Sequence, residues 1–359
     1  MIFFALRTQY SNPGDELINT ALLRELAART RVIALCVDVP DWYVENVMLG
    51  LGRHGANVTL ERHSARFYAR ILARAFGREK IWVYLSCGDT TQTKEHDARD
   101  YLKSTILGTL QRFPAVHVGM VGVSTARITS SRAWLLRMAQ TRGGAITVRD
   151  TASKAVLERH GIDAMLVPDL AFALSFSPKP RQETVVLSFR SHNAISDALL
   201  TEGLKRVVPW ALALGFKLAV VWQVEHDRAF SEALAKILDL PLIVREAPRI
   251  NRLAELTAIY DKSGFVLSNR LHVLLLGASR GAIPIALLAR EDRKISPLLQ
   301  DNGLGAIAIR VEDEMAADHV IAALSSAEDV ADRLRDTFGR NRWVISEHFT
   351  AVHGTAQAG

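Results

Sequence analysis

The chain has 359 residues, of which 49% are hydrophobic and 23% charged, and it carries a formal net charge of +6. These proportions are typical of a soluble globular protein, and the length suits two domains of ordinary size. They argue against a membrane-spanning chain, because no apolar stretch approaches the roughly 20 residues that a spanning helix needs. The two cysteines, Cys36 and Cys87, stand outside any metal-ligand spacing, which argues against a disulfide framework or a structural zinc site and favours the cytoplasm.

The first half of the chain alternates short apolar runs with segments of helical periodicity. The first run predicts a strand rather than a signal peptide, because acidic residues follow it early and no charged leader precedes it. Strands are expected at Ile2–Leu6, Val32–Val37, Ile81–Ser86, Val116–Val123 and Ala145–Val148. Helices are expected between them, including Asp15–Arg29, Tyr101–Phe113 and Arg132–Arg142. Runs that are apolar on both faces and separated by helices indicate parallel strands covered on both sides.

A polar, proline-containing stretch at residues 178–183 is typical of a linker. We therefore expect an N-terminal domain over residues 1–177 and a C-terminal domain over 184–359 that ends in a helical tail. In the second domain, strands are expected at Thr184–Phe189, Lys217–Trp222, Pro241–Val244, Gly264–Ser268, Pro284–Leu288 and Gly305–Ile309. Helices between them include Asp197–Gly215 and Asn251–Gly264.

The fold class that follows is α/β, with two tandem doubly wound, Rossmann-like domains facing across a cleft. Ligands of such sheets bind beyond the carboxyl ends of the strands. Polar residues at strand-to-helix junctions are therefore the candidates for chemistry, and those in the middle of helices are not.

A basic helix is expected at Glu61–Lys80, where arginines recur at steps of four: Arg62, Arg66, Arg70, Arg74 and Arg78. One interpretation is an amphipathic surface helix with a basic outer face. The other is peripheral contact with anionic lipid headgroups or an anionic glycolipid. Nucleic acid is not expected as a partner, because no recognition motif or aromatic platform is present.

Two junctions in the first half combine a glycine with polar residues. Asn12, Gly14 and Asp15 follow the first strand, and Gly88 and Asp89 follow the third. A glycine there lets the backbone approach a ligand, and a helix start can hold an anion. Ordinary capping of the next helix explains the same residues, and the spacing is not that of a phosphate loop.

Arginines mark two further junctions. Arg149 ends the strand at Ala145–Val148, just before a helix that Asp150 or Thr151 can cap, and its planar fork suits a carboxylate or phosphate. A salt bridge to a nearby acid explains Arg149 equally well. Arg270 and His272 are expected in the first turn of a helix after the strand Gly264–Ser268, where a cation is locally unfavourable and an anionic ligand would compensate. Lys294 lies in the polar loop after the next strand, as a surface lysine also would.

Taken in order, the motifs SNPGDELI, VRDTAS, VPDLAFAL and SNRLHVLLLGASRGAIPIALL resemble those of the polysaccharide pyruvyltransferase family, from about Ser11 to Leu304. The resemblance implies a fold like that of the GT-B glycosyltransferases. It also implies transfer of pyruvate from phosphoenolpyruvate onto two hydroxyls of a sugar, which makes a cyclic ketal and releases phosphate.

The resemblance also implies roles for individual residues. His272 would act as the catalytic acid and base, since imidazole titrates near neutral pH. Arg149, Arg270, Leu271 and Lys294 would bind the donor, whereas Asn12, Gly14, Asp15, Gly88 and Asp89 would lie on the acceptor side or in the cleft. Phosphoenolpyruvate would be a co-substrate, and neither a metal nor another cofactor is expected.

Two other functions remain open at this point. The first is a GT-B-type glycosyltransferase with a nucleotide-sugar donor, whose arginine would bind a diphosphate. The second is a non-catalytic scaffold of a polysaccharide-assembly complex, which would predict loss of donor residues. The acceptor is expected to be a precursor of a bacterial exopolysaccharide or cell-surface glycan, and a lipid-linked one would fit the basic helix.

Overall fold

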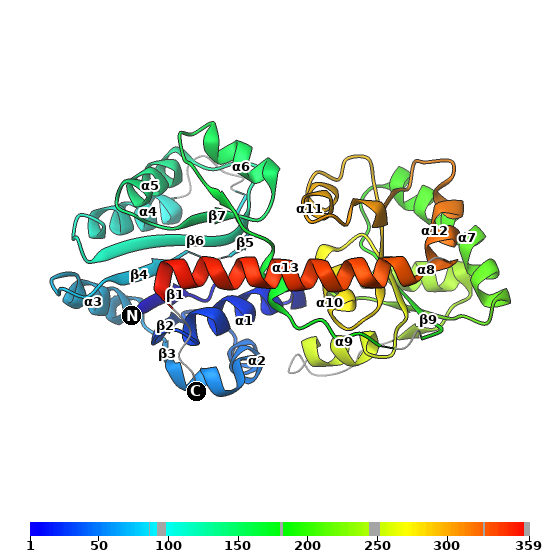
Figure 1. The fold of residues 1–359 in the computed structure, drawn as a ribbon, viewed down its shortest axis with the longest axis horizontal. Helices are drawn as coiled ribbons and strands as arrows, with labels where there is room; N and C mark the ends of the chain where they lie inside the picture. Colours follow the sequence, from blue (N-terminus) through cyan, green and yellow to red (C-terminus); the bar gives the residue numbers. More distant parts are fainter. Residues whose placement is uncertain (86, 92–97, 180–181, 244–251, 326, 355–359) are drawn as a thin grey trace. The chain divides into compact units, whose positions relative to one another are not determined.

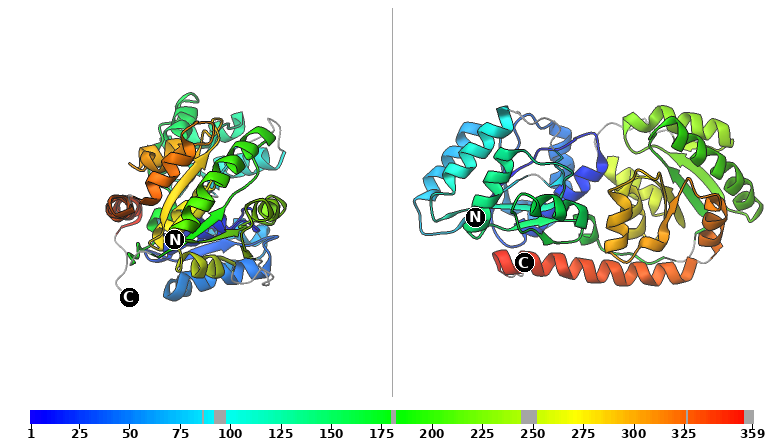
Figure 2. Two further views of the ribbon diagram at one scale, coloured as in Figure 1. Left: turned by 90° about the vertical axis from the view of Figure 1, so that its right-hand side faces the viewer. Right: turned by 90° about the horizontal axis from the view of Figure 1, so that it is seen from above.

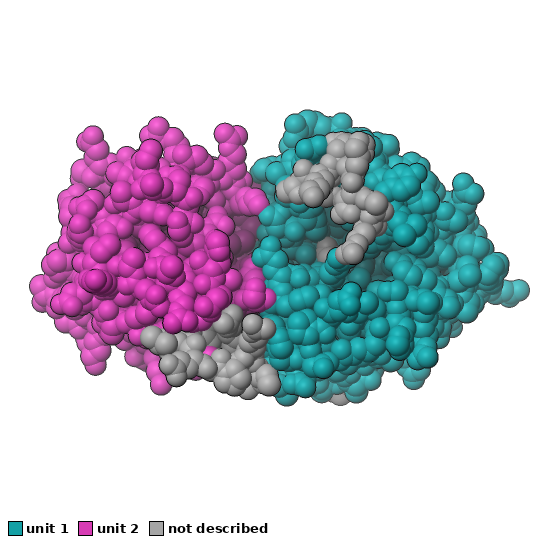
Figure 3. All heavy atoms as spheres, turned by 180° about the vertical axis from the view of Figure 1, so that it is seen from behind, with its two compact units in different colours: residues 1–10, 15–170, 343–359 teal, residues 11–14, 171–342 magenta. Residues whose placement is uncertain are grey.

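The computed structural model describes residues 1–85, 87–91, 98–179, 182–243, 252–325 and 327–354 (Figure 1). Contacts within the chain divide it into two units, which Figure 3 colours separately. Unit 1 comprises residues 1–10, 15–170 and 343–359, and unit 2 comprises residues 11–14 and 171–342.

Unit 1 is built on a parallel sheet. Its strands are β1 (Ile2–Ala5), β2 (Val32–Leu35), β3 (Val58–Glu61), β4 (Ile81–Tyr84), β5 (Gly88–Asp89), β6 (Val116–Ser124), β7 (Ile146–Val148) and β8 (Met165–Leu166). They run in the order β3-β2-β1-β4-β6-β7-β8, with β5 paired to β6. Chain order reverses direction between β1 and β4, and this is the topological switch point of a doubly wound sheet.

Helices cover both faces of this sheet. They are α1 (Pro13–Ala27), α2 (Asp41–Leu51), α3 (Ser64–Ala75), α4 (Ala98–Leu110), α5 (Ser130–Thr141) and α6 (Thr151–Glu158). On one face, side chains of α3, α4, α5 and α6 form one buried apolar cluster with the strands, which includes Phe3, Phe67 and Val118. On the other face lies the end of the last helix, α13 (Ala327–His353), where the Tyr84 hydroxyl and His353 Nε2 are 2.7 Å apart.

Unit 2 repeats the same topology. Its strands are β9 (Thr184–Ser188), β10 (Lys217–Val221), β11 (Leu242–Ile243), β12 (Phe265–Ser268), β13 (Ile283–Leu288) and β14 (Ala308–Arg310), all in parallel pairs. The order is β11-β10-β9-β12-β13-β14, so the switch point lies between β9 and β12.

The helices of unit 2 flank its sheet on both faces (Figure 2). They are α7 (Ala194–Ala213), α8 (Arg228–Leu238), α9 (Arg252–Tyr260), α10 (Leu271–Ser279), α11 (Ile295–Asp301), α12 (Ala316–Ser325) and residues 327–342 of α13. Apolar residues of α7, α8 and α12 form one core with the strands. On the opposite face α10 packs closely on β12, since a Cβ added at Gly277 would lie 2.8 Å from Val266 Cγ2.

The α/β class and the two doubly wound sheets were predicted from the sequence and are confirmed. The expected strands are present, each within about two residues, except at Gly305–Ile309, where a 3-10 turn occupies Gly305–Ile307 and β14 begins only at Ala308. Strand β3 and helix α2 were missed; β3 has only four residues, VTLE, which is too short a run to stand out. Several of the expected elements and junctions extend into residues that the structure does not describe. These are Ser86, residues 92–97, Val244 and Asn251.

The division into units differs from the expected domains at the C-terminus. The helical tail was expected in the second domain, yet residues 343–359 belong to unit 1. Contacts such as that of His353 with Tyr84 explain the difference. The first unit runs to Leu170, and Pro180 and Arg181 of the expected linker lie outside the described residues.

The basic segment 61–80 is only partly helical, because α3 spans Ser64–Ala75. Phe67, Ile71 and Ala75 are its buried residues, so the apolar face of the helix lies against the unit 1 core. Arg62 lies before the helix and pairs with Asp41 at 2.7 Å. Among the described residues, no helix is long and apolar enough to cross a membrane.

Candidate functional site

The carboxyl edge of the unit 2 sheet carries two arginines at its switch point. Arg190 follows β9 and Arg270 follows the neighbouring strand β12. The Arg190 N–H donates to Asn269 Oδ1 at 2.8 Å, and Asn269 Nδ2 donates to the Arg190 carbonyl at 2.8 Å. This reciprocal pair of bonds fixes the two strand ends side by side, at the place where doubly wound sheets bind ligands.

Arg270 was expected in the first turn of the helix, but it is the residue before α10, with an extended backbone (φ −118°, ψ 122°). Its N–H donates to Ser268 Oγ at 2.9 Å, and its guanidinium Nη2 donates to Asp227 Oδ1. Asp227 follows β10 and is 1% exposed. The charge of Arg270 at the helix start is therefore compensated by Asp227, an acid of the protein itself.

His272 is the second residue of α10 and lies against the backbone of Gly14. Both residues belong to unit 2. A Cβ added at Gly14 would lie 2.7 Å from His272 Cγ and 2.8 Å from His272 Cβ, and closer still to Nδ1. Real Cβ atoms essentially never come within 3.0 Å of such neighbours, so only glycine fits here without a shift. The junction that contains Gly14 thus contacts the junction that contains Arg270 and His272. Leu271, between these two residues, is the first residue of α10.

The remaining residues of that first junction organise the turn between β1 and α1. Asn12 Oδ1 accepts the Gly14 N–H at 3.1 Å. Asp15 Oδ2 accepts the Thr8 hydroxyl at 2.5 Å and the Gln9 N–H at 3.2 Å. Asp15 therefore holds the preceding loop through its side chain, in addition to lying in the first turn of α1.

Lys294 is exposed and immediately precedes α11, after β13. Asp292 supplies the cap at this helix start, because its carboxylate accepts the N–H groups of Ile295 at 3.1 Å and Ser296 at 2.8 Å. Lys294 thus lies at the end of the strand next to β12, as the sequence predicted. Its expected role in donor binding stays a prediction.

Arg149 lies in unit 1 and is 7% exposed. Its Nη1 donates to Asp169 Oδ2 at 2.6 Å, and its Nε donates to Ser124 Oγ at 2.7 Å. Burial acts to lower the pKa of Arg149, but the ion pair with Asp169 outweighs it and the pKa is raised. Of the two readings of Arg149, the salt bridge is present in this structure, and a role in donor binding stays a prediction.

Asp150, the next residue, caps α6 by accepting the Ser153 N–H at 2.7 Å, and the Ser124 hydroxyl donates to its other oxygen at 2.5 Å. Ser124 thereby joins Arg149 and Asp150 into one buried network. This network accounts for the VRD and VPD motifs together, because Asp169 belongs to the second of them.

Gly88 and Asp89 were expected in a turn after β4, but they form the two-residue strand β5, which pairs with β6. Gly88 has φ +89°, a conformation that favours glycine, and its added Cβ would lie 3.1 Å from Ile18. Asp89 is exposed, and its Oδ1 accepts the Thr91 N–H at 3.0 Å. A short strand, and not only a turn, therefore occupies this junction, and the acceptor role of both residues stays a prediction.

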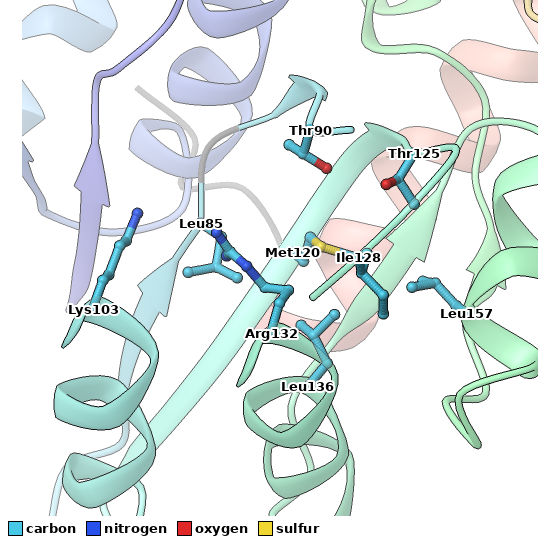
Figure 4. Close-up of a pocket in the computed structure, with 9 residues that line it drawn as sticks. All are labelled: Leu85, Thr90, Lys103, Met120, Thr125, Ile128, Arg132, Leu136 and Leu157. Atoms are coloured by element: carbon cyan, nitrogen blue, oxygen red, sulfur yellow. The ribbon is translucent and has the colours of Figure 1, made fainter. Parts of the chain in front are cut away.

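A cavity of about 80 Å³ lies at the carboxyl edge of the unit 1 sheet (Figure 4). Apolar residues such as Met120 and Ile128 line it, together with the hydroxyls of Thr90 and Thr125. Lys103 of α4 and Arg132 of α5 complete the lining, and the sequence did not single out either of them.

Two sheets of the same doubly wound order, each with polar residues at its switch point, define the class of two-domain Rossmann-like proteins to which the GT-B enzymes belong. The chain is similar in fold to a putative UDP-N-acetylglucosamine 2-epimerase from Listeria monocytogenes (TM-score 0.54, 12% identity, covering 100% of this chain and 99% of that one). It is also similar to UDP-GlcNAc 2-epimerase from Neisseria meningitidis bound to UDP-GlcNAc (TM-score 0.53, 12% identity, 98% and 97% covered). A third similar structure is the Thermobaculum terrenum O-GlcNAc transferase mutant (TM-score 0.50, 15% identity, 98% of this chain covered). The chain spans 65% of the length of that protein.

Within that class the chain belongs to the polysaccharide pyruvyl transferase family, whose model matches residues 12–282. The match contains Gly14, Arg149, Arg270 and His272 and ends before Lys294. No curated protein matches the chain.

Sequence reasoning missed the acids that hold the arginines. Asp169 and Asp227 are as buried as core residues, at 0% and 1% exposed, and each lies far along the chain from its arginine. In the sequence, both acids could be noticed only because they follow apolar runs. Acids that merely cap a helix show the same pattern, so it does not single out a partner of an arginine. Arg190 had the same signal as Arg149, an arginine just after a strand, and was overlooked.

Proposed function

We propose that this chain transfers pyruvate from phosphoenolpyruvate to two hydroxyls of a sugar, forming a cyclic ketal and releasing phosphate. The single observation that carries the proposal is the arrangement at the unit 2 switch point. There Asp227 accepts a hydrogen bond from Arg270 at the start of α10. His272 lies two residues after Arg270, in the first turn of the helix, and Gly14 packs against it. Membership of the polysaccharide pyruvyl transferase family supports it.

Phosphoenolpyruvate carries a carboxylate and a phosphate on the same carbon, C2. An arginine fork binds either group through two parallel hydrogen bonds. The free N–H groups and positive end of α10 favour negative charge at the same place. Arg270 and the first turn of α10 can therefore bind the donor anion. Arg149, Leu271 and Lys294 are further donor-binding residues of the proposal, and the family resemblance supports them.

Ketal formation needs a proton at C3 of the donor and removal of protons from the sugar. Protonated His272 gives its proton to C3, and the C2 cation that results bonds to the first sugar hydroxyl, whose proton returns to His272. The bond from C2 to the phosphate oxygen then breaks, and its electron pair leaves with phosphate. The second hydroxyl closes the ring at C2, and its proton leaves on hydrogen phosphate. One phosphoenolpyruvate and one sugar diol thus give one ketal and one hydrogen phosphate.

The alternative is a nucleotide-sugar glycosyltransferase. The solved structure with bound UDP-GlcNAc is similar to this chain in fold, at 12% identity, and supports the fold alone. Arg270 would then bind a diphosphate. The two functions differ in the donor that the site binds.

Calorimetric titration separates them, with phosphoenolpyruvate and UDP-glucose as rival ligands. The wild type, Arg270→Ala, His272→Ala and the surface variant Arg206→Ala would each be titrated. The proposal expects phosphoenolpyruvate to bind to the wild type and to Arg206→Ala, and to lose about 10-fold or more in affinity in Arg270→Ala, since a charge-assisted hydrogen bond contributes about 1.5–3 kcal/mol. Binding of UDP-glucose alone would contradict it.

The acceptor is proposed to be a bacterial exopolysaccharide or cell-surface glycan precursor. Its proposed contacts are the segments that contain Asn12 and Asp15 and Gly88 and Asp89. Since phosphoenolpyruvate is a metabolite of the cytoplasm, the reaction is proposed to take place there. A lipid-linked acceptor would bring the basic segment around α3 to the inner face of the membrane.

A further inference from the structure

Arg190 occupies the position that a doubly wound sheet reserves for ligand contact. It lies two residues after the end of β9, the first strand of unit 2. Its backbone N–H and carbonyl both form hydrogen bonds with the side chain of Asn269, the residue before Arg270. The two arginines thus stand on either side of the switch point. Neither the family motifs nor the sequence pattern singled out Arg190.

The two guanidinium groups act on each other. Desolvation, and then the positive charge of Arg270, lower the pKa of Arg190, whereas Asp292 and Asp227 act in the opposite direction. Two cations held within range of one another are stable only when negative charge lies close by. The charge balance at this edge of the sheet therefore depends on which acids are already engaged.

Three of the four carboxylate oxygens of the nearby acids already have partners. Asp227 Oδ1 accepts from Arg270, and both oxygens of Asp292 accept N–H groups at the start of α11, whereas Asp227 Oδ2 is buried without a hydrogen-bond partner among the described residues. Arg190 itself forms no ion pair within 4.0 Å with any residue that the structure describes, and its side chain is exposed. The site thus has one guanidinium paired with an acid and a second one available to an anion.

Two buried donors at the same edge of the sheet lack partners in the described part of the protein. Arg270 Nε and Gln223 Nε2 are buried donors without a hydrogen-bond partner among the described residues, and Gln223 is 2% exposed. Gln223 follows β10, which pairs with β9, so it belongs to the same edge. Buried donors without partners are uncommon in folded proteins, because each one loses its hydrogen bonds to water without replacement. Their presence beside an unpaired arginine is a second, independent indication of an anion site.

We infer that Arg190 is the second guanidinium of this site and binds the phosphate group of the donor together with Arg270. A phosphate carries close to two negative charges, which the Arg270–Asp227 pair alone does not balance. The inference rests on the proposed function for the identity of the donor, but the anion site itself needs only a phosphate. Asp227 acts as a positioning residue. Its Oδ1 accepts the hydrogen bond that fixes the Arg270 guanidinium, and this oxygen does not contact the ligand.

The test is titration with inorganic phosphate and with phosphoenolpyruvate, at two salt concentrations, of the wild type, Arg190→Ala and Arg190→Gln. Arg206→Ala is the matched control, because Arg206 is also an exposed arginine of unit 2 and pairs with Asp318 at 3.1 Å, away from the strand ends. We expect both Arg190 variants to bind either ligand about 10- to 100-fold more weakly than the control. Their affinity should also depend less on salt, a change that a purely structural role would not produce.

The outcomes separate this inference from the proposed function. If the wild type binds phosphoenolpyruvate and both Arg190 variants bind it as tightly as Arg206→Ala, the inference is wrong and the proposed function stands. If the wild type binds phosphate but not phosphoenolpyruvate, and Arg190→Ala loses phosphate, the anion site is supported and the proposed donor is wrong. If the wild type binds neither ligand, both fall.

Discussion

Replacing Gly14 by alanine should impair catalysis more than it impairs folding. The new Cβ would lie 2.7 Å from His272 Cγ, about 0.7 Å short of the 3.4 Å at which ordinary contact begins. Rotation of the imidazole cannot relieve this overlap, because His272 Cβ would also be only 2.8 Å away. The first turn of α10 or of α1 must therefore move by several tenths of an ångström.

Such overpacking costs about 1–3 kcal/mol in stability, which corresponds to a fall in Tm of about 1–4 °C for a chain of this size. A catalytic group displaced by about 1 Å costs on the order of 100-fold in rate. We expect kcat to fall by about 10- to 100-fold, with a smaller change in the KM for phosphoenolpyruvate, because Arg270 keeps its bond to Asp227.

The matched control is Gly203→Ala, in the interior of α7. A Cβ there meets nothing within 4 Å, and alanine stabilises a helix interior by about 0.5–1 kcal/mol relative to glycine. Turnover and thermal unfolding of both variants would be measured side by side. If Gly14→Ala matched Gly203→Ala in kcat, His272 would not be the acid and base, or its position would not matter.

Three further predictions concern the rest of the molecule. Arg149→Met should lower the free energy of unfolding in urea by about 3–5 kcal/mol, because it leaves buried Asp169 without its cation. Adding Asp169→Leu to the same chain should restore most of that free energy. An unchanged urea midpoint in Arg149→Met would refute the buried pair. Burial lowers the pKa of His348 to about 4, so the unfolded chain gains this proton first, and stability should fall by about 1 kcal/mol per pH unit as the pH drops from about 6.5 towards 4. His348→Gln should remove that contribution and leave the similar one of His353, whose pKa burial also lowers to about 4; an equal slope in both proteins would contradict the assignment. Alanine at the five arginines of the basic segment should weaken binding to anionic vesicles while leaving phosphoenolpyruvate binding unchanged, since each cation near such a surface contributes about 1 kcal/mol; equal vesicle binding would end the membrane proposal. These five are Arg62, Arg66, Arg70, Arg74 and Arg78.

The sequence was sufficient for the fold class because the central strands of both sheets are apolar on both faces. In β12 and β13 every residue is buried, and that pattern is visible without a structure. The basic segment at 61–80 was predicted as one helix because the four-residue arginine spacing continues on both sides of it. The helix instead ends at Ala75, and Arg62 and Arg78 lie outside it.

The candidate site was predicted only as far as local sequence reaches. Arg270 and His272 are separated by one residue just after a strand, and an arginine at that junction is conspicuous. Their supports come from distant parts of the chain: Asp227 is 43 residues before Arg270, and Gly14 lies at the other end of the sequence. Local patterns do not encode such pairs, because the parallel topology brings strand ends together across long connections.

Turnover in deuterium oxide tests the central claim most directly. The purified chain would be incubated with phosphoenolpyruvate and the glycan-precursor pool of a bacterial extract as acceptor, and the modified glycan would be examined by mass spectrometry and NMR. Protonation of C3 during ketal formation predicts a ketal methyl group with a single deuterium, free phosphate in equal amount, and loss of both in His272→Ala. A ketal methyl without deuterium, or phosphate attached to the glycan in place of pyruvate, would contradict the account.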